Sequence, residues 1–168
     1  MNGREPRAIH AKALRIWGFS MPVQLRPITP GTHGFAALEA ESLRNGFGML
    51  ERLRQAWGSD ANYTFDRPGE MLAGAFYNEQ LVGIGGRSID PYAGNPRIGR
   101  VRHVYVLQDL RGSGVGRLLV ENILRDAGNH FIRLTLRAPP AAFGFYEHLG
   151  FDRVDDEETV THHLIIPT

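Results

Sequence analysis

The chain has 168 residues and no cysteine, and its 19 lysine and arginine side chains nearly balance its 18 aspartates and glutamates. This length fits one domain with its own core, and the lack of cysteine excludes disulfides, thiolate zinc sites and cysteine nucleophiles. A formal net charge of +1 gives no basic excess for binding a nucleic-acid backbone. No apolar run approaches the roughly 20 residues of a membrane helix. We expect a cytoplasmic domain without membrane or nucleic-acid partners.

The first twenty residues differ from the rest of the chain. They carry four basic side chains against one acid, and the charges of Lys12 and Arg15 interrupt what would have to be the apolar core of a signal peptide. We expect residues 1–20 to be an appendage that can be flexible and residues 21–168 to be the domain. A basic organelle-targeting leader and a start-site artefact stay open as alternatives.

The first half of the domain predicts strands around two helices. Residues 23–28 alternate apolar and polar side chains, as a strand does. Residues 33–57 have helical spacing but contain Asn45-Gly46 and Gly48, which favours two short helices. Apolar runs at 71–77 and 81–89 predict a hairpin, and residues 98–107 predict a third antiparallel strand. The expected apolar face of the two helices consists of Leu43, Phe47, Leu50, Leu53 and Trp57.

The second half changes period. An apolar helical stripe runs from Val115 to Ala127 and stops at Gly128-Asn129, a C-cap signal. A strand at 131–136 follows, and a strand–helix–strand unit of this length normally makes a right-handed parallel crossover. A short helix at 141–149 and strands at 151–154 and 160–166 complete the chain. The sheet is therefore mixed and mostly antiparallel, and the fold class is α+β.

A glycine-rich segment, Arg111-Gly112-Ser113-Gly114-Val115-Gly116-Arg117, joins a strand to the amphipathic helix. Backbone amides at a helix N-terminus bind phosphates, and glycines allow close approach. The nucleotide loop that ends in Gly-Lys-Ser/Thr is not matched, and neither is the dinucleotide pattern G-x-G-x-x-G. The alternative is a turn that only tightens the strand–helix junction.

Two motifs in this order resemble the signatures of the GNAT N-acetyltransferase superfamily. Arg111-x-x-Gly114-x-Gly116 resembles its acetyl-CoA motif, and Phe145-Tyr146-Glu147-His148-Leu149-Gly150-Phe151 resembles its second motif. The resemblance covers residues 22–166. It implies helices flanking a sheet that splays at its central parallel strands, with acetyl-CoA in the gap and no metal. The implied cofactor residues are Tyr105, Val106, Arg111, Gly112, Ser113, Gly114, Val115, Gly116 and Arg117.

The resemblance also implies catalytic roles. Tyr146 matches the tyrosine that protonates the departing thiolate, with a structural tyrosine as the alternative, and the Val106 amide matches the oxyanion donor. The strand before the loop lacks the glutamate base that many members carry. His103 is a candidate base, although strand alternation could equally bury it, and Glu41 and Glu70 are weaker ones.

The loop after the strand at 131–136 also departs from the superfamily. Pro139 replaces a frequent asparagine there, and Arg137 is a candidate to reach a CoA phosphate.

The expected function is direct transfer of an acetyl group from acetyl-CoA to a primary amine of a small molecule or protein. Two alternatives stay open. One is a non-catalytic acyl-CoA-binding or regulatory module, with which the missing glutamate is compatible. The other is a toxin-like aminoacyl-tRNA acetyltransferase, against which the balanced charge argues. A homodimer is compatible with the sequence, and the acceptor cannot be read from it.

Overall fold

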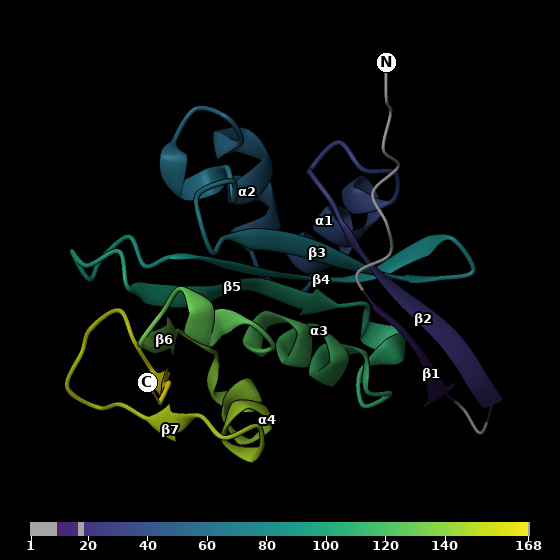
Figure 1. The fold of residues 1–168 in the computed structure, drawn as a ribbon. Helices are drawn as coiled ribbons and strands as arrows, with labels where there is room; N and C mark the ends of the chain where they lie inside the picture. Colours follow the sequence, from purple (N-terminus) through teal and green to yellow (C-terminus); the bar gives the residue numbers. More distant parts are fainter. Residues whose placement is uncertain (1–9, 17–18, 168) are drawn as a thin grey trace.

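One mixed sheet organises the molecule. The computed structural model describes residues 10–16 and 19–167, and its strands follow the order β1-β2-β3-β4-β5-β6-β8-β7 (Figure 1). The strands are β1 (His10–Ile16), β2 (Phe19–Pro27), β3 (Met71–Tyr77), β4 (Gln80–Ile89), β5 (Ile98–Val106), β6 (Arg133–Leu136), β7 (Asp152–Arg153) and β8 (His162–Ile165). Every neighbouring pair is antiparallel except β5 and β6, which are parallel. The predicted mixed, mostly antiparallel α+β sheet is confirmed.

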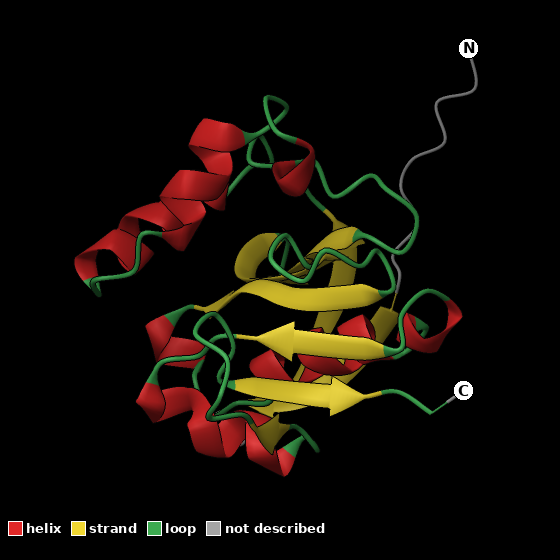
Figure 2. Ribbon diagram, turned by 90° about the vertical axis from the view of Figure 1, so that its left-hand side faces the viewer, coloured by secondary structure: helices red, strands yellow, loops and turns green. Residues whose placement is uncertain are grey.

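The helices cover both faces of this sheet. Helices α1 (Phe35–Arg44) and α2 (Met49–Ala56) lie on one face, and α3 (Val115–Leu124) and α4 (Phe143–His148) lie on the other (Figures 1 and 2). Helix α3 makes the predicted parallel crossover from β5 to β6. Of the described helices, none combines the length and apolar composition needed to cross a membrane.

The predicted break between the first two helices is confirmed. Gly46 has φ +82°, which a side chain rarely adopts, so a helix cannot continue through it. The predicted apolar face is wrong at Leu43, which is 43% exposed. Phe35 and Leu38 of α1 are fully buried instead, because the break lets α1 rotate independently of α2.

Glycines in β4 bring α3 close to the sheet. A Cβ at Gly83 would lie 3.0 Å from Leu119 Cδ1 and 3.2 Å from Val115 Cγ1, both on the buried stripe of α3. A Cβ at Gly85 would lie 3.3 Å from Ile123 Cδ1. These distances leave little room for a side chain, so the two glycines fix the height of α3 above β4.

Part of the expected N-terminal appendage is joined to the sheet. β1 pairs with β2 from His10↔Leu25 to Ile16↔Phe19, so β2 begins four residues before the predicted strand at 23. Residues 1–9 and 17–18 lie outside the described residues. The division into an appendage and a domain stays a prediction.

Candidate active site

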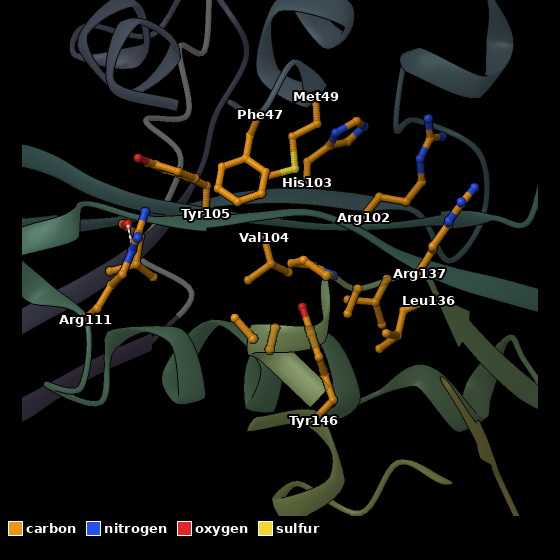
Figure 3. Close-up of a pocket in the computed structure, with 16 residues that line it drawn as sticks. Phe47, Met49, Arg102, His103, Val104, Tyr105, Arg111, Leu136, Arg137 and Tyr146 are labelled. Carbon is orange, nitrogen blue, oxygen red and sulfur yellow. Dashed lines mark hydrogen bonds between the residues drawn. The ribbon is translucent and has the colours of Figure 1, made fainter. Parts of the chain in front are cut away.

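The parallel pairing covers only the first part of β5. Residues 98–100 pair with residues 133–135, and beyond Arg100 and Thr135 the two strands separate. A cavity of about 310 Å³ lies in the gap. Its walls are residues 101–106, residues 136–139, 141, 142 and 146, and Phe47, Met49 and Arg111 (Figure 3). The splayed central strands that the resemblance implied are present.

Val106 turns its backbone into this gap. The amide of Leu107 donates to the carbonyl of Val82 at 3.0 Å, so Leu107 faces β4. Backbone groups alternate along an antiparallel strand, and those of Val106 therefore face away from β4. On that side β6 pairs with β5 only as far as Arg100. The Val106 N–H is consequently available to a ligand in the gap.

A β-bulge interrupts β5 at His103. Arg102 pairs with Gly86 and Tyr105 pairs with Ile84, so His103 and Val104 together oppose one residue of β4. His103 has φ +59°, a left-handed conformation that is uncommon for a side-chain-bearing residue. Such a bulge re-aims side chains and leaves one backbone residue unpaired. The sequence pattern gave no signal for it.

The glycine-rich loop leads directly into α3. Gly112 and Gly114 have φ +80° and +100°, and Gly114 is the N-cap of α3 without any side-chain cap. The first helical bond runs from Leu118 N to Gly114 O at 3.0 Å, so the amides of residues 115–117 have no partner within the helix. A Cβ at Gly112 would meet nothing within 4 Å. This arrangement suits a phosphate.

The polar side chains of this loop have different surroundings. Arg111 Nε donates to Val106 O at 3.3 Å, and its guanidinium lies 5.3 Å from the centre of the Tyr105 ring. The Ser113 hydroxyl donates to Leu110 O and is engaged within the loop. Arg117 donates to Glu121 at 2.7 Å on the exposed side of α3. Of these three side chains, Arg111 lines the cavity.

Tyr146 reaches into the cavity from α4. Its ring packs edge-on against Phe145 and Phe151, with centroid distances of 5.0 and 5.7 Å, and its hydroxyl points toward Val104 (Figure 3). Burial raises the pKa of Tyr146 above that of a free phenol. The hydroxyl therefore stays protonated at neutral pH and can donate.

His103 lies on the opposite wall, against aromatic rings. Its ring centre is 5.7 Å from that of Phe65 and 6.3 Å from that of Tyr63, and both ring nitrogens are buried without a hydrogen-bond partner. Burial, together with the positive charges of Arg102 and Arg52, lowers the pKa of His103 to about 3. The imidazole is therefore neutral at pH 7.

The two alternative bases are held by other groups. Glu41 accepts from the Tyr105 hydroxyl at 2.5 Å and from Gln108 N at 3.1 Å, while Asn45 donates to the same hydroxyl. Burial raises the pKa of Tyr105, and its bond to Glu41 raises it further. Glu70 binds Arg67 and the amide of Ile89, away from the cavity.

The cavity is lined by cations and by no acid. Arg102, Arg111 and Arg137 contribute to its walls, and none of its lining residues is an aspartate or glutamate. Figure 3 places Arg111 at one end and Arg102 and Arg137 at the other. A contact of Arg137 with a CoA phosphate stays a prediction. Sequence reasoning missed Arg102, Phe47 and Met49 as site residues. Within the described residues there is no group of three potential metal ligands.

Known proteins share this architecture. An acetyltransferase (GNAT) domain model matches residues 55–167. A mycothiol acetyltransferase of Rhodococcus opacus is 35% identical over 111 residues, which are 62% of this chain and 34% of that protein, and one of Rhodococcus jostii is 33% identical over the same shares. The chain thus spans about a third of the length of these relatives.

Solved structures agree with the sequence relatives. A protein of Exiguobacterium assigned as an acetyltransferase superposes with a TM-score of 0.76 and 32% identity, over 85% of this chain and 93% of that one. The PaiA N-acetyltransferase of Thermoplasma acidophilum, solved with coenzyme A, has a TM-score of 0.64 at 14% identity, over 86% and 99% of the two chains, and so shares the fold. The family model spans most of the chain and includes the strands on both sides of the gap between β5 and β6. The chain therefore belongs to the GNAT acetyltransferase family.

Proposed function

We propose that this domain transfers the acetyl group of acetyl-CoA directly to an amine. One observation carries the proposal: a buried, protonated tyrosine hydroxyl stands in the gap between β5 and β6, and an uncapped, glycine-rich helix start follows the open end of β5. The family membership and the structure of a family member with coenzyme A support the choice of donor.

The residues fit the parts of acetyl-CoA. The unpartnered amides of residues 115–117, with Arg111 beside them, suit the diphosphate. The Val106 N–H, turned into the gap, suits the peptide-like pantetheine arm or the thioester carbonyl, whose oxygen gains negative charge as the amine attacks. Gly112, where a Cβ would meet nothing within 4 Å, leaves the space that a close approach needs.

Tyr146 supplies the proton that the leaving group needs. When the amine nitrogen bonds to the carbonyl carbon, the carbon–sulfur bond breaks and the sulfur takes the tyrosine proton. The amine nitrogen loses one proton, which restores the Tyr146 hydroxyl, so the products are an amide and a thiol. A neutral phenol is suited to this role because it is a donor at neutral pH.

His103 is assigned to the amine side of the reaction. With a pKa of about 3 the imidazole does not take up a second proton near neutral pH, yet the unprotonated one of its two unpartnered nitrogens can accept a hydrogen bond from an amine N–H. We assign it the task of orienting the amine lone pair toward the thioester.

A second candidate is an acyl-CoA-binding module without turnover. The lack of any carboxylate among the lining residues favours it, because no strong base faces the acceptor. Two measurements separate the candidates: the shift in melting temperature with acetyl-CoA, against NAD and ATP as controls, and thiol release over a panel of amines. Stabilisation with turnover supports the enzyme, and stabilisation without turnover supports the module. No stabilisation by millimolar acetyl-CoA contradicts both.

A further inference from the structure

Two arginines stand together where the sheet opens. Arg100 and Thr135 are the last paired residues of β5 and β6. Arg102 and Arg137 each follow two positions later on the parallel strands, so the register brings them to the same level just beyond the point of separation. Figure 3 shows both side chains at one end of the cavity, the end opposite Arg111.

Neither arginine has an acidic partner. Arg102 donates to the carbonyl of Asn62 at 2.5 Å and to the Ser88 hydroxyl at 3.3 Å, and it lies over the Tyr63 ring at 4.7 Å. Burial lowers the pKa of Arg102. Across the described residues, no carboxylate lies within 4 Å of either guanidinium. Arg137 is exposed and has no hydrogen bond in that part of the chain.

The neighbouring Arg100 shows how the charge of a buried arginine is neutralised in this fold. Arg100 lies 3.7 Å from Asp90, which also accepts from the Thr135 hydroxyl at 2.6 Å. Arg87 pairs with Asp126, and Arg67 pairs with Glu70. A partly buried arginine without a counter-ion is costly unless a ligand supplies one. Arg102 is such an arginine, and the exposed Arg137 adds a second positive charge at the same end of the cavity, so the two are placed to receive an anion.

This anion does not belong to the cofactor's diphosphate. Arg111, which begins the glycine-rich loop that suits the diphosphate, lies at the opposite end of the cavity (Figure 3). Between the two ends stand Tyr146 and Val104, where the thioester would react. An anion at the Arg102 and Arg137 end would consequently lie on the acceptor side of the reacting bond.

We propose that the acceptor is a small amine carrying its own oxyanion, a carboxylate or a phosphate, which Arg102 and Arg137 bind. The proposal rests on the proposed acetyl transfer. A cavity of about 310 Å³ suits a small acceptor. Phe47 and Met49 line the same cavity and suit an apolar side chain on the acceptor.

The positive charges of the two arginines also favour the neutral, nucleophilic form of a bound amine. Nearby cations disfavour an ammonium ion, so they lower the pKa of a bound amine and favour the neutral nucleophile. A simple alkylammonium would be repelled, whereas an acceptor with an oxyanion balances the arginines. The lack of a carboxylate in the cavity then agrees with catalysis, because no strong base is needed to hold the amine neutral.

The test compares amines that differ only in the oxyanion. Leucine against isopentylamine and phenylalanine against phenethylamine test a carboxylate, and phosphoethanolamine against ethanolamine tests a phosphate. We expect kcat/KM for at least one acid to exceed that of its partner by about tenfold or more, which is ~1.4 kcal/mol. The pair that shows the preference identifies the source of the oxyanion.

Variants at Arg137 assign the preference to this site. Arg137→Gln is expected to raise KM for the preferred acid about tenfold. The KM for the partner amine without the oxyanion and the KM for acetyl-CoA should stay unchanged. Arg137→Glu is expected to reverse the preference. The exposed Arg125, which lies outside the cavity, supplies the matched control Arg125→Gln, which should change neither.

The other possible results of these experiments also support or overturn the oxyanion site. Equal turnover of acids and their partners overturns this inference and leaves acetyl transfer standing. If acetyl-CoA binds without turnover, calorimetry of the same pairs on the CoA-saturated protein replaces kinetics: tighter binding of an acid, lost in Arg137→Gln, supports the oxyanion site, and equal or absent binding overturns it. Failure to bind acetyl-CoA contradicts the proposed function itself.

Discussion

The two halves of β5 differ in what lies beside them. Along residues 98–100 the strand is closed by β6, and its buried charge is matched, since Arg100 has Asp90, Thr135 and the carbonyl of Thr159 as partners. Along residues 101–106 β6 has turned away, and the polar groups of Arg102, His103 and Val106 face a cavity. One strand thus contributes stability at one end and binding groups at the other. Changes in each half should affect different measurements.

The most complete loss, that of all acetyl-CoA binding, is expected where the open half continues into the loop. Gly116→Asp places a carboxylate at the start of α3, where it would repel the diphosphate. A Cβ there meets Phe145 at 3.4 Å, an ordinary contact, so the fold should persist. Acetyl-CoA at a hundredfold excess over its dissociation constant should stabilise the wild type by about 2.7 kcal/mol and the variant by nothing measurable.

Thermal denaturation with and without acetyl-CoA measures this effect. Gly31→Asp, at an exposed turn with an ordinary 3.5 Å contact, is the control and should keep the full shift. An undiminished shift in Gly116→Asp would mean that the loop is a structural turn.

The closed half is broken by Asp90→Asn. This change leaves Arg100 buried without its acidic partner and should lower the free energy of unfolding by about 3 kcal/mol, the low end for a broken buried pair, because Arg100 keeps its bond to Thr159 O at 2.7 Å. Urea denaturation measures the loss. Acetyl-CoA affinity at permissive temperature should stay within a few-fold of the wild type, and a large affinity loss would show that the two halves are coupled.

Tyr146→Phe tests the chemistry of the open half. The ring still packs on Phe145 and Phe151, but the donor is gone, so acetyl-CoA affinity should hold while the single-turnover rate falls about a hundredfold. Tyr77→Phe, a half-buried tyrosine outside the cavity, is the matched control. An unchanged single-turnover rate would remove Tyr146 from the mechanism.

The smallest expected effect is a pH dependence at His103. The pKa of His103 in the folded protein, about 3, lies below its unfolded value near 6.5, so the unfolded chain binds more protons between these values. The stability from this residue is complete above pH 6.5 and falls as the pH drops toward 3. Between pH 7 and 5.5 the loss should be about 1 kcal/mol.

His103→Asn should flatten this part of the stability profile. Asparagine tolerates the left-handed backbone at this position and does not titrate. Urea denaturation of both proteins at the two pH values makes the comparison. Identical slopes would show that the buried imidazole is protonated alike in both states.

Local patterns predicted the parts of the fold that are local. The stripe from Val115 to Ile123 and the loop before it predicted the crossover, and the alternation in β3 and β4 predicted the hairpin. The strand β1 was missed because residues 10–16 mix basic and small side chains without a clean alternation. The face of α1 was wrong at Leu43 because a glycine break decouples the phases of two helices.

The site was predictable where its residues lie close in sequence. Arg111 to Arg117 form one segment, and Tyr146 belongs to a second short motif. Arg102 and Arg137 come together through strand register, and Glu41 meets Tyr105 across 64 positions. The low pKa of His103 follows from its burial and from the charges of Arg102 and Arg52, and the spacing of one strand does not show how deeply the ring is buried.

The glycines beneath α3 also bear on the length of acyl donor that the site would accept. Gly83 and Gly85 let Leu119, Val115 and Ile123 rest almost on the backbone of β4, so no flexible side chain can adjust the height of the helix. A diphosphate bound at the start of α3 would therefore lie at a fixed distance from Tyr146. The arm of the donor would have to span that distance. Under the proposed function, residues that touch neither substrate would thus set which length of acyl carrier can bring its carbonyl to Tyr146.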